Sequence, residues 1–283
     1  MRKALLGLTL LTTGLVANAE HYSQDVNKND NLFFNFKVMQ GLDQKNPGGQ
    51  KNDTYLELEF GGRKGIMDLY GYVDLKNVFG STDNDSYNGD NFFAEIKPRF
   101  SIDGMTGKDL SIGPFKEWYI STWIKAGDNS FDEDGNGQGG LWHNGIGLGT
   151  DVEVPWFGTT GLSLLAVYKK EDLGSRAQGH WDGYSLQWNW FKPLHFFENG
   201  SFVSYQGYVT YDFGADEIAK NPGRTKDSLQ WYNGFYWHNN DWAIGYGLKV
   251  FNNMANFKDG EAPFGSTEDT SGVGHYFDIG YKF

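Results

Sequence analysis

Apolar and polar residues alternate along much of this chain with a period of two, which predicts β-strands. In the last of these strands, one face carries Phe277, Ile279, Tyr281 and Phe283, while Asp278 and Lys282 lie on the other. An aromatic, alternating end of this kind is typical of a barrel strand that faces lipid. The same alternation predicts twelve strands, in residues 31–40, 54–60, 66–78, 92–100, 115–125, 142–154, 160–168, 182–191, 201–213, 228–238, 242–251 and 273–283.

The connections between the predicted strands differ from one side to the other. One side has mostly short or turn-like connections, at residues 61–65, 101–114, 155–159, 192–200 and 238–241. The other side has connections rich in Asn, Asp and Gly, at residues 41–53, 79–91, 126–141, 169–181, 214–227 and 252–272. Outer-membrane barrels have long outer loops, short periplasmic turns and an even number of strands. We therefore predict an all-β fold: a transmembrane antiparallel up-and-down β-barrel of 12 strands, forming a single domain over residues 20–283.

The start of the chain predicts export. Arg2 and Lys3 precede an apolar run over residues 4–16, and Ala17-Asn18-Ala19 is an A-x-A cleavage site. Residues 1–19 thus have the features of a signal peptide that is cleaved before Glu20. No later segment approaches the ~20 consecutive apolar residues of a spanning helix, so a membrane crossing needs a closed sheet. We expect an integral protein of the outer membrane of a Gram-negative bacterium.

The alternation also assigns each strand residue to the lipid or to the lumen. A Lys or Arg on the lipid face near the midplane costs roughly 2–4 kcal/mol, which excludes one-residue shifts that would expose several charges. Leu56, Leu58 and Phe60 are therefore expected to face outward. The expected lumen is wet, mixed in charge and rich in tyrosine, with Tyr55, Glu57, Glu59, Asp68, Tyr70, Tyr72, Asp74, Lys76, Glu95, Lys97, Arg99, Glu117, Tyr119, Trp123, Lys125, Ser204, Gln206 and Tyr208.

Composition supports this architecture and excludes some functions. Aromatic residues make up 17% of the chain, which suits girdles at the two membrane interfaces. The absence of cysteine argues against a disulfide-stapled domain, a thiol nucleophile and a thiolate metal site. The net charge is −12 and the chain has no basic run, so nucleic acid is not an expected partner.

The expected lumen is the strongest candidate for a functional site. Aromatic rings can stack on a base or sugar while charged groups bond its polar atoms, which suits small polar aromatic solutes. Alternatively, the charged residues only hold the shape of the barrel and hydrate it. Asp132, Asp134 and Asn136 match the opening of a calcium loop, but His143 replaces the bidentate Glu, so this is at most a weak cation site. The histidines lack a zinc spacing and no nucleophile motif is present, so we expect no cofactor and no enzyme.

Several segments of this chain resemble segments of the Tsx-type nucleoside-specific channels and of their OmpK branch from marine bacteria. They occur in the same order along the chain as in the family. The segments are NDTYLE (52–57), DLYGYVD (68–74), KPRFSIDG (97–104), GPFKEWY (113–119), GLGTD (147–151) and WDGY (181–184), and WFKP (190–193) and FFENGSF (196–202) resemble the OmpK branch. The resemblance covers essentially the whole chain after residue 19.

This resemblance implies a monomeric twelve-stranded barrel with a narrow, keyhole-shaped pore. It implies that nucleosides and deoxynucleosides diffuse through weak binding sites, and that the outer loops serve as phage receptors. The implied partners are these solutes, outer-membrane lipid and lipopolysaccharide, and phage tail proteins. The candidate substrate-binding residues are those in which a family segment and lumenal alternation coincide: Tyr55, Glu57, Asp68, Tyr70, Tyr72, Asp74, Arg99, Glu117 and Tyr119.

We therefore expect a passive outer-membrane channel for nucleosides and related small polar solutes. Two alternatives remain open. The first is a surface-display barrel that acts as a phage or adhesion receptor through loops such as 126–141 and 252–272. The second is an outer-membrane barrel hydrolase, which would require a Ser and a His of this chain to approach within hydrogen-bond reach.

Overall fold

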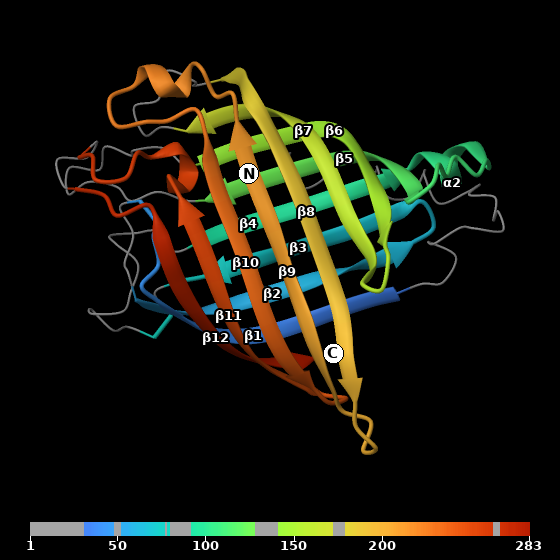
Figure 1. Cartoon of the computed structure of the whole chain (residues 1–283). Coiled ribbons are helices and arrows are strands. Elements are labelled where there is room, and N and C mark those ends of the chain that lie inside the picture. Colours follow the sequence, from blue (N-terminus) through green and yellow to red (C-terminus); the bar gives the residue numbers. More distant parts are fainter. Residues whose placement is uncertain are drawn as a thin grey trace, which may run out of the picture.

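The computed structural model describes residues 31–47, 52–76, 78–79, 92–127, 141–171, 179–262 and 267–283. In these residues twelve antiparallel strands close into one barrel, with β1 paired to β12 and every other strand paired to its neighbours in the sequence (Figure 1). This confirms the predicted fold. The strands are β1 Asn31–Leu42, β2 Asp53–Lys64, β3 Met67–Leu75, β4 Phe92–Ser101, β5 Phe115–Gly127, β6 Leu141–Val154, β7 Gly158–Glu171, β8 His180–Phe196, β9 Phe202–Phe213, β10 Ser228–His238, β11 Trp242–Asn252 and β12 Gly272–Lys282.

The largest differences from the predicted strands lie at the short connections. β2 continues through Gly61 and Gly62, which the sequence placed in a turn, and only residues 65–66 connect it to β3. The strand continues because Gly61 stays in register with Phe33 of β1. A Cβ atom at Gly61 would lie 2.9 Å from the Phe33 ring, so the missing side chain lets the two strands pack closely.

A short helix, α2 (Ile102–Thr106), lies in the connection between β4 and β5, where the sequence predicted no regular structure. The Ser101 hydroxyl caps it by accepting a 2.7 Å hydrogen bond from the Gly104 N–H. The buried Asp103 carboxylate accepts N–H bonds from Leu110 (2.8 Å) and Trp118 (3.0 Å), which fastens the helix to the barrel. No helix among the described residues is long and apolar enough to cross a membrane.

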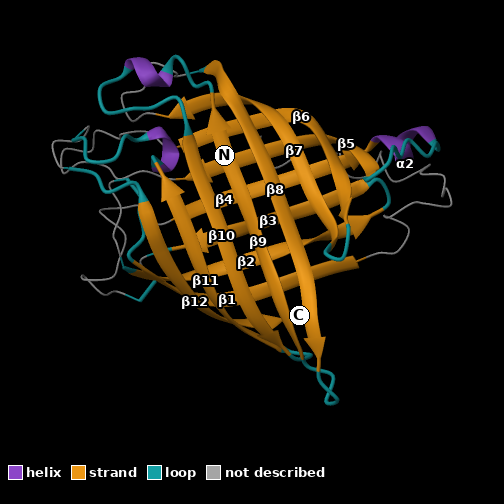
Figure 2. Cartoon of the chain, viewed as in Figure 1, coloured by secondary structure: helices purple, strands orange, loops and turns teal. Residues whose placement is uncertain are grey.

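The two ends of the barrel differ in their connections. One end has mostly short connections, and we call it the turn end; its connections are residues 65–66, 102–114, 155–157, 197–201 and 239–241. The opposite end is the loop end, whose described residues outside the strands are 43–47, 52, 76, 78–79, 179, 214–227, 253–262 and 267–271. The loop end carries the short helices η1 (Ile218–Lys220) and η2 (Met254–Asn256), whereas α2 lies at the turn end (Figure 2). This asymmetry is the one that the sequence predicted.

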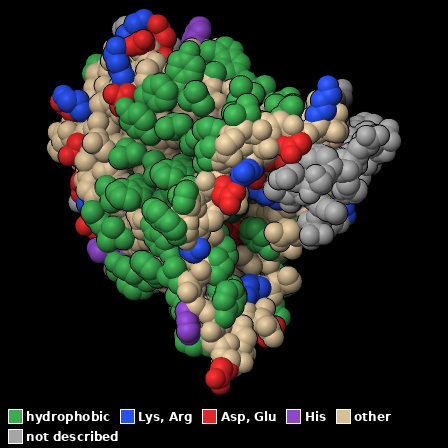
Figure 3. Space-filling model, turned by 45° about the vertical axis from the view of Figure 1, so that its right-hand side comes forward, with side chains coloured by type: hydrophobic (Ala, Val, Ile, Leu, Met, Phe, Trp, Pro, Cys, Tyr) green, Lys and Arg blue, Asp and Glu red, His purple; other side chains and the backbone are tan. Residues whose placement is uncertain are grey.

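The outer face of the barrel is largely apolar. Figure 3 shows hydrophobic side chains over a broad part of this face, with charged side chains mostly toward its margins. Exposed apolar side chains on the strands include Ile120, Ile146, Leu148, Leu164, Ile244, Phe277 and Ile279. The last residue closes the seam between β12 and β1: the Phe283 N–H donates to the Phe34 carbonyl (3.0 Å), and the two rings lie 5.6 Å apart. An apolar exterior is what a strand in contact with lipid requires.

The inner face combines polar residues with small apolar clusters. Met39, Tyr55, Phe251 and Tyr276 form one cluster toward the loop end. Trp123, Leu165 and Val167 form another, on β5 and β7. Most of the remaining buried side chains are polar or charged, which is the reverse of a water-soluble domain.

Candidate functional site

Contacts between strands that are not neighbours define the lumen. The Lys97 ammonium on β4 lies 5.8 Å from the centre of the Tyr208 ring on β9. The Arg63 guanidinium on β2 lies 2.6 Å from the Asp151 carboxylate on β6. Because β4 and β9 are five positions apart in a ring of twelve strands, these side chains meet inside the barrel. The lumen is therefore narrow enough for side chains to cross it.

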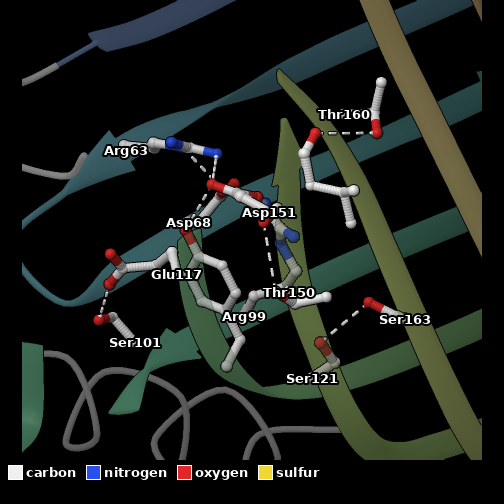
Figure 4. Close-up of polar contacts among 12 residues, drawn as sticks. Arg63, Asp68, Arg99, Ser101, Glu117, Ser121, Thr150, Asp151, Thr160 and Ser163 are labelled. Carbon is white, nitrogen blue, oxygen red and sulfur yellow. Dashed lines mark hydrogen bonds and ion pairs between the residues drawn. The ribbon is translucent and has the colours of Figure 1, made fainter. Parts of the chain in front are cut away.

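Four charged residues near the turn end form an ion-pair square: Arg63, Asp68, Arg99 and Asp151 (Figure 4). Arg63 binds Asp68 (2.8 Å) and Asp151 (2.6 Å). Arg99 also binds both carboxylates, with 3.0 Å to Asp151. The two positive and two negative charges compensate one another, so the square joins β2, β3, β4 and β6 without a net charge.

Tyr119 and Glu117 pack beside the ion-pair square and are fully buried. The Tyr119 hydroxyl donates to Asp151 (2.9 Å), and the Arg99 guanidinium lies 4.1 Å above the Tyr119 ring. The Glu117 carboxylate accepts a hydrogen bond from the Ser101 hydroxyl. Neither side chain has surface left to contact a solute in this conformation.

A second group of charges lies further along the lumen, on β1 to β4. The Lys37 ammonium lies between two carboxylates, 2.9 Å from Glu57 and 2.8 Å from Glu59. The Tyr70 hydroxyl donates to Glu59 (3.0 Å), and the residue is 38% exposed, so a solute can reach it.

The next tyrosine along this wall is held in the same way, because its hydroxyl also donates a hydrogen bond to a carboxylate. The Tyr72 hydroxyl donates to Glu95 (3.0 Å), which also pairs with Lys97 (2.5 Å). The rings of Tyr70 and Tyr72 lie 6.4 Å apart. This wall therefore presents tyrosine rings whose hydroxyl groups are held by carboxylates.

A second tyrosine-rich wall lies on β9, β10 and β12; β9 and β10 lie across the ring of strands from β3, whereas β12 is the neighbour of β1. Tyr208 and Tyr232 stack with their ring centres 5.6 Å apart, and Tyr276 meets Tyr232 edge to face at 6.2 Å. The hydroxyl groups of Tyr232 and Tyr236 share a 2.5 Å hydrogen bond. The ammonium of Lys249 lies 5.7 Å from the Tyr208 ring centre, on the side of the pore opposite β4.

Glycines on β11 let these rings lie against the sheet. A Cβ atom at Gly247 would lie 2.1 Å from the Tyr232 hydroxyl oxygen, and one at Gly245 would lie 2.1 Å from the Tyr236 ring. A larger residue at either position would push the ring toward the pore. The open width of the lumen therefore depends on two residues without side chains.

The nine candidate binding residues of the sequence analysis divide into two sets. Tyr55, Glu57, Tyr70, Tyr72 and Asp74 lie along the tyrosine-rich part of the lumen. Asp68, Arg99, Glu117 and Tyr119 lie in or beside the ion-pair square. The structure brings the members of each set together and separates the two sets along the pore.

Several residues that complete these sets are not among the candidates predicted from the sequence. Arg63 was assigned to a turn, although it is the β2 partner of Asp68. Asp151 lies in a family segment and on the lumenal face, so the same criteria could have selected it. Tyr208 had the correct alternation but lies outside the family segments. Its contact with Lys97 depends on the closure of the barrel.

One Ser and one His do approach each other, which was the test for a hydrolase. The Ser204 hydroxyl lies 2.8 Å from the His238 Nε2 atom. Ser204 is fully buried, and the Phe202 ring stacks on the imidazole at 4.5 Å. Within the described residues no carboxylate hydrogen-bonds His238. The pair thus lacks the access and the orienting acid that a catalytic Ser–His pair uses, and it connects β9 to β10.

The candidate cation loop cannot be placed, because Asp132, Asp134 and Asn136 lie outside the described residues. In the part of the chain that is described, no group of three or more His, Asp and Glu side chains is arranged to hold a metal ion.

A closed barrel with an apolar exterior and a polar, charged interior is a transmembrane barrel of the channel type. Residues 28–283 match the model of a family described as "Nucleoside-specific channel-forming protein, Tsx", and the chain belongs to this family. The sequence-based resemblance is thus confirmed.

Two relatives of known name match along their whole length. The chain is 41% identical to outer membrane protein OmpK of Vibrio parahaemolyticus and 31% identical to nucleoside-specific channel-forming protein Tsx of Salmonella typhimurium, with each comparison covering 100% of both chains. Among solved structures, the outer membrane channel DcaP of Acinetobacter baumannii has a TM-score of 0.40 at 11% identity, over 90% of this chain and 97% of that chain.

Proposed function

We propose that this protein is a passive outer-membrane channel for nucleosides and similar small polar aromatic solutes. Its relatives support this function by name, because Tsx of Salmonella typhimurium is called nucleoside-specific and channel-forming. The mechanism is diffusion through weak binding sites, which favour entrance and still allow release. No chemical step and no cofactor take part in this mechanism.

The observation that carries the proposal is the pair of facing tyrosine walls. Tyr70 and Tyr72 lie on β3, and Tyr208 and Tyr232 lie on β9 and β10, on the opposite side of the barrel. A flat base can stack on these rings as it passes. The carboxylates and ammonium groups beside the rings, such as Glu57, can bond the ribose hydroxyl groups.

The ion-pair square has a different proposed role. Its charges are already paired, and Glu117 and Tyr119 beside it are fully buried. We therefore assign Asp68, Arg99, Glu117 and Tyr119 to the shape of the pore, which is the alternative that the sequence analysis left open for its charged residues. Tyr55, Glu57, Tyr70, Tyr72 and Asp74 remain the candidates for contact with the solute, because even the least exposed of them, Tyr55 and Asp74, keep 8% of their surface exposed.

Recordings from single channels in planar lipid bilayers test the function. Nucleosides should reduce the ionic current in a saturable way and at weak affinity, and free bases or sugars should reduce it less. Tyr72→Ala and Tyr208→Ala should each weaken the block by about 1–3 kcal/mol, the usual contribution of an aromatic ring stacked on a base.

Tyr211→Ala is the matched control, because Tyr211 lies on the same strand as Tyr208 and is exposed on the outer face. It should leave the block unchanged. If nucleosides give no saturable block of the unsubstituted channel while simple ions pass, the protein is a general pore or a display barrel, and the nucleoside function is wrong.

The remaining expectations stay predictions. The signal peptide, residues 1–19, lies outside the described residues. With the short connections in the periplasm, the loop end faces the exterior and meets lipopolysaccharide, and phage tail proteins would bind there. We propose a monomer. Phage adsorption to cells that carry the wild-type or a loop-exchanged protein would test the receptor role independently of conduction.

A further inference from the structure

Residues 253–257, which follow β11, lie inside the loop end of the barrel; we call this segment the crossbar. Its Met254 side chain packs against the lumenal cluster formed by Met39, Tyr55, Phe251 and Tyr276. Asn256, the last residue of η2, is 3% exposed. The crossbar is therefore packed into the mouth of the pore.

The crossbar reaches a distant strand. The Lys169 ammonium on β7 donates to the Asn256 Oδ1 atom, and this 2.9 Å contact is buried. β7 lies four positions from β11 and five from β12 around the ring of twelve strands. Since Lys169 is on the lumenal face of β7, the contact crosses part of the opening.

A second contact holds the crossbar to the neighbouring loop. The Arg224 guanidinium donates to the carbonyl groups of Ala255 (3.1 Å) and Asn256 (3.1 Å). It also lies 3.8 Å from the centre of the Phe257 ring. Arg224 and Phe257 face each other as an antiparallel backbone pair. The two loops are thus joined through main chain and side chains together.

The backbone of the crossbar is strained. Asn253, Ala255 and Asn256 have φ angles of 49°, 55° and 62°, in the left-handed region that residues with a Cβ atom seldom occupy. Such a conformation persists only where surrounding contacts hold it. Lys169 and Arg224 supply side-chain contacts of this kind, in addition to main-chain bonds such as the one from the Thr225 N–H to the Asn256 carbonyl (2.9 Å), so losing them should loosen the segment.

We propose that the crossbar is the outer constriction of the channel, and that Lys169 and Arg224 hold it across the mouth. The inference rests on the proposed channel function, but it concerns the width of the pore rather than its preferred solute. Release of the crossbar widens the mouth, raises the conductance and weakens the discrimination against large solutes.

A reducible cross-link tests the proposal in one molecule. The chain has no cysteine, so Arg224→Cys together with Phe257→Cys introduces the only thiols. These residues form a non-hydrogen-bonded antiparallel pair, in which the side chains lie close enough for a disulfide. The oxidised channel should conduct like the wild type, because a covalent bond replaces the lost contacts.

Adding a reductant to the same open channel should then raise its conductance in potassium chloride, since the mouth lies in series with the tyrosine walls and adds its own resistance to ion flow. Each single-cysteine variant should not respond to an oxidant. Because oxidised and reduced states are compared in one inserted channel, a folding defect cannot explain the change.

Lys169→Met gives a second measurement, because it keeps an unbranched side chain that is only one atom shorter and removes the ammonium. It should raise conductance, whereas Lys170→Met, at the exposed neighbouring position on β7, should not. Unchanged conductance in Lys169→Met and in the reduced double-cysteine channel would overturn the proposal. Nucleoside block is measured separately, so failure of the crossbar leaves the solute assignment standing, and the reverse also holds.

Discussion

Arg99 on β4 and Asp151 on β6 form a 3.0 Å ion pair that passes over β5, the strand between them. Tyr119 of β5 fills the space below this pair, bonding Asp151 through its hydroxyl and Arg99 through its ring. Arg63 then extends the network to β2, four strands from β6. These contacts cross the lumen, so they restrain the cross-section of the barrel in a way that hydrogen bonds between neighbouring strands do not.

Removing one charge from the ion-pair square should destabilise the barrel. Asp151→Asn leaves two guanidinium groups with one carboxylate in a buried site, at a cost of about 3–5 kcal/mol. Urea-induced unfolding in lipid vesicles, followed by tryptophan fluorescence, measures the free energy of unfolding. Glu153→Gln is the control on the same strand: its carboxylate is 61% exposed and lies 3.6 Å from Lys116, so its loss should cost at most about 1 kcal/mol. Equal effects of the two substitutions would contradict a special role for the square.

The glycines behind the tyrosine wall should control the conductance. Gly247→Ala places a methyl group where the Tyr232 hydroxyl lies and should push that ring toward the pore. Single-channel conductance in the absence of nucleosides should fall. Gly127→Ala is the control, because its Cβ atom would meet only ordinary contacts at 3.5 Å or more. A conductance that is unchanged in Gly247→Ala would show that Tyr232 does not limit ion flow.

Labelling of single cysteines should separate the two faces of β3. Tyr72 bonds the lumenal Glu95, whereas Val73 belongs to the opposite face of the strand. A small, polar thiol reagent added to intact membranes should therefore label Tyr72→Cys and leave Val73→Cys unmodified. The background is zero, because the chain has no cysteine. The reverse pattern would overturn the assignment of faces and the lumenal candidates with it.

The last residue should matter more for assembly than for conduction. Phe283 bonds Phe34 through its backbone and packs on Tyr281 with ring centres 5.1 Å apart, at the seam that closes the barrel. Deleting Phe283 or replacing it with Ala should lower the amount of heat-modifiable, membrane-inserted protein. Channels that do insert should keep their conductance, because the ring lies outside the lumen. Normal insertion of both variants would count against this role.

Local patterns in the sequence were enough to predict the strands and their faces. Tyr70, Tyr72 and Asp74 alternate with outward residues such as Val73, and a shift by one residue would place charges in lipid. The cost of placing a charge in lipid applies to each strand separately. The faces of a strand can therefore be predicted without knowledge of the rest of the fold. The prediction from local patterns was wrong at Gly61 and Gly62. There, close packing on β1 extends β2 through residues that usually form a turn.

The tertiary structure alone decided which lumenal residues meet. Arg63 and Asp151 are 88 positions apart in the sequence, and Lys97 reaches Tyr208 from a strand five places away. No local pattern encodes such pairs, because the tilt and stagger of all the strands together set which side chains lie at the same height in a closed barrel. For the same reason, the sequence predicted both Tyr119 and Tyr72 as substrate-binding candidates and could not distinguish between them. In the closed barrel Tyr119 lies level with the ion-pair square and is buried beneath its paired charges. Tyr72 lies level with the facing tyrosines and stays beside the pore.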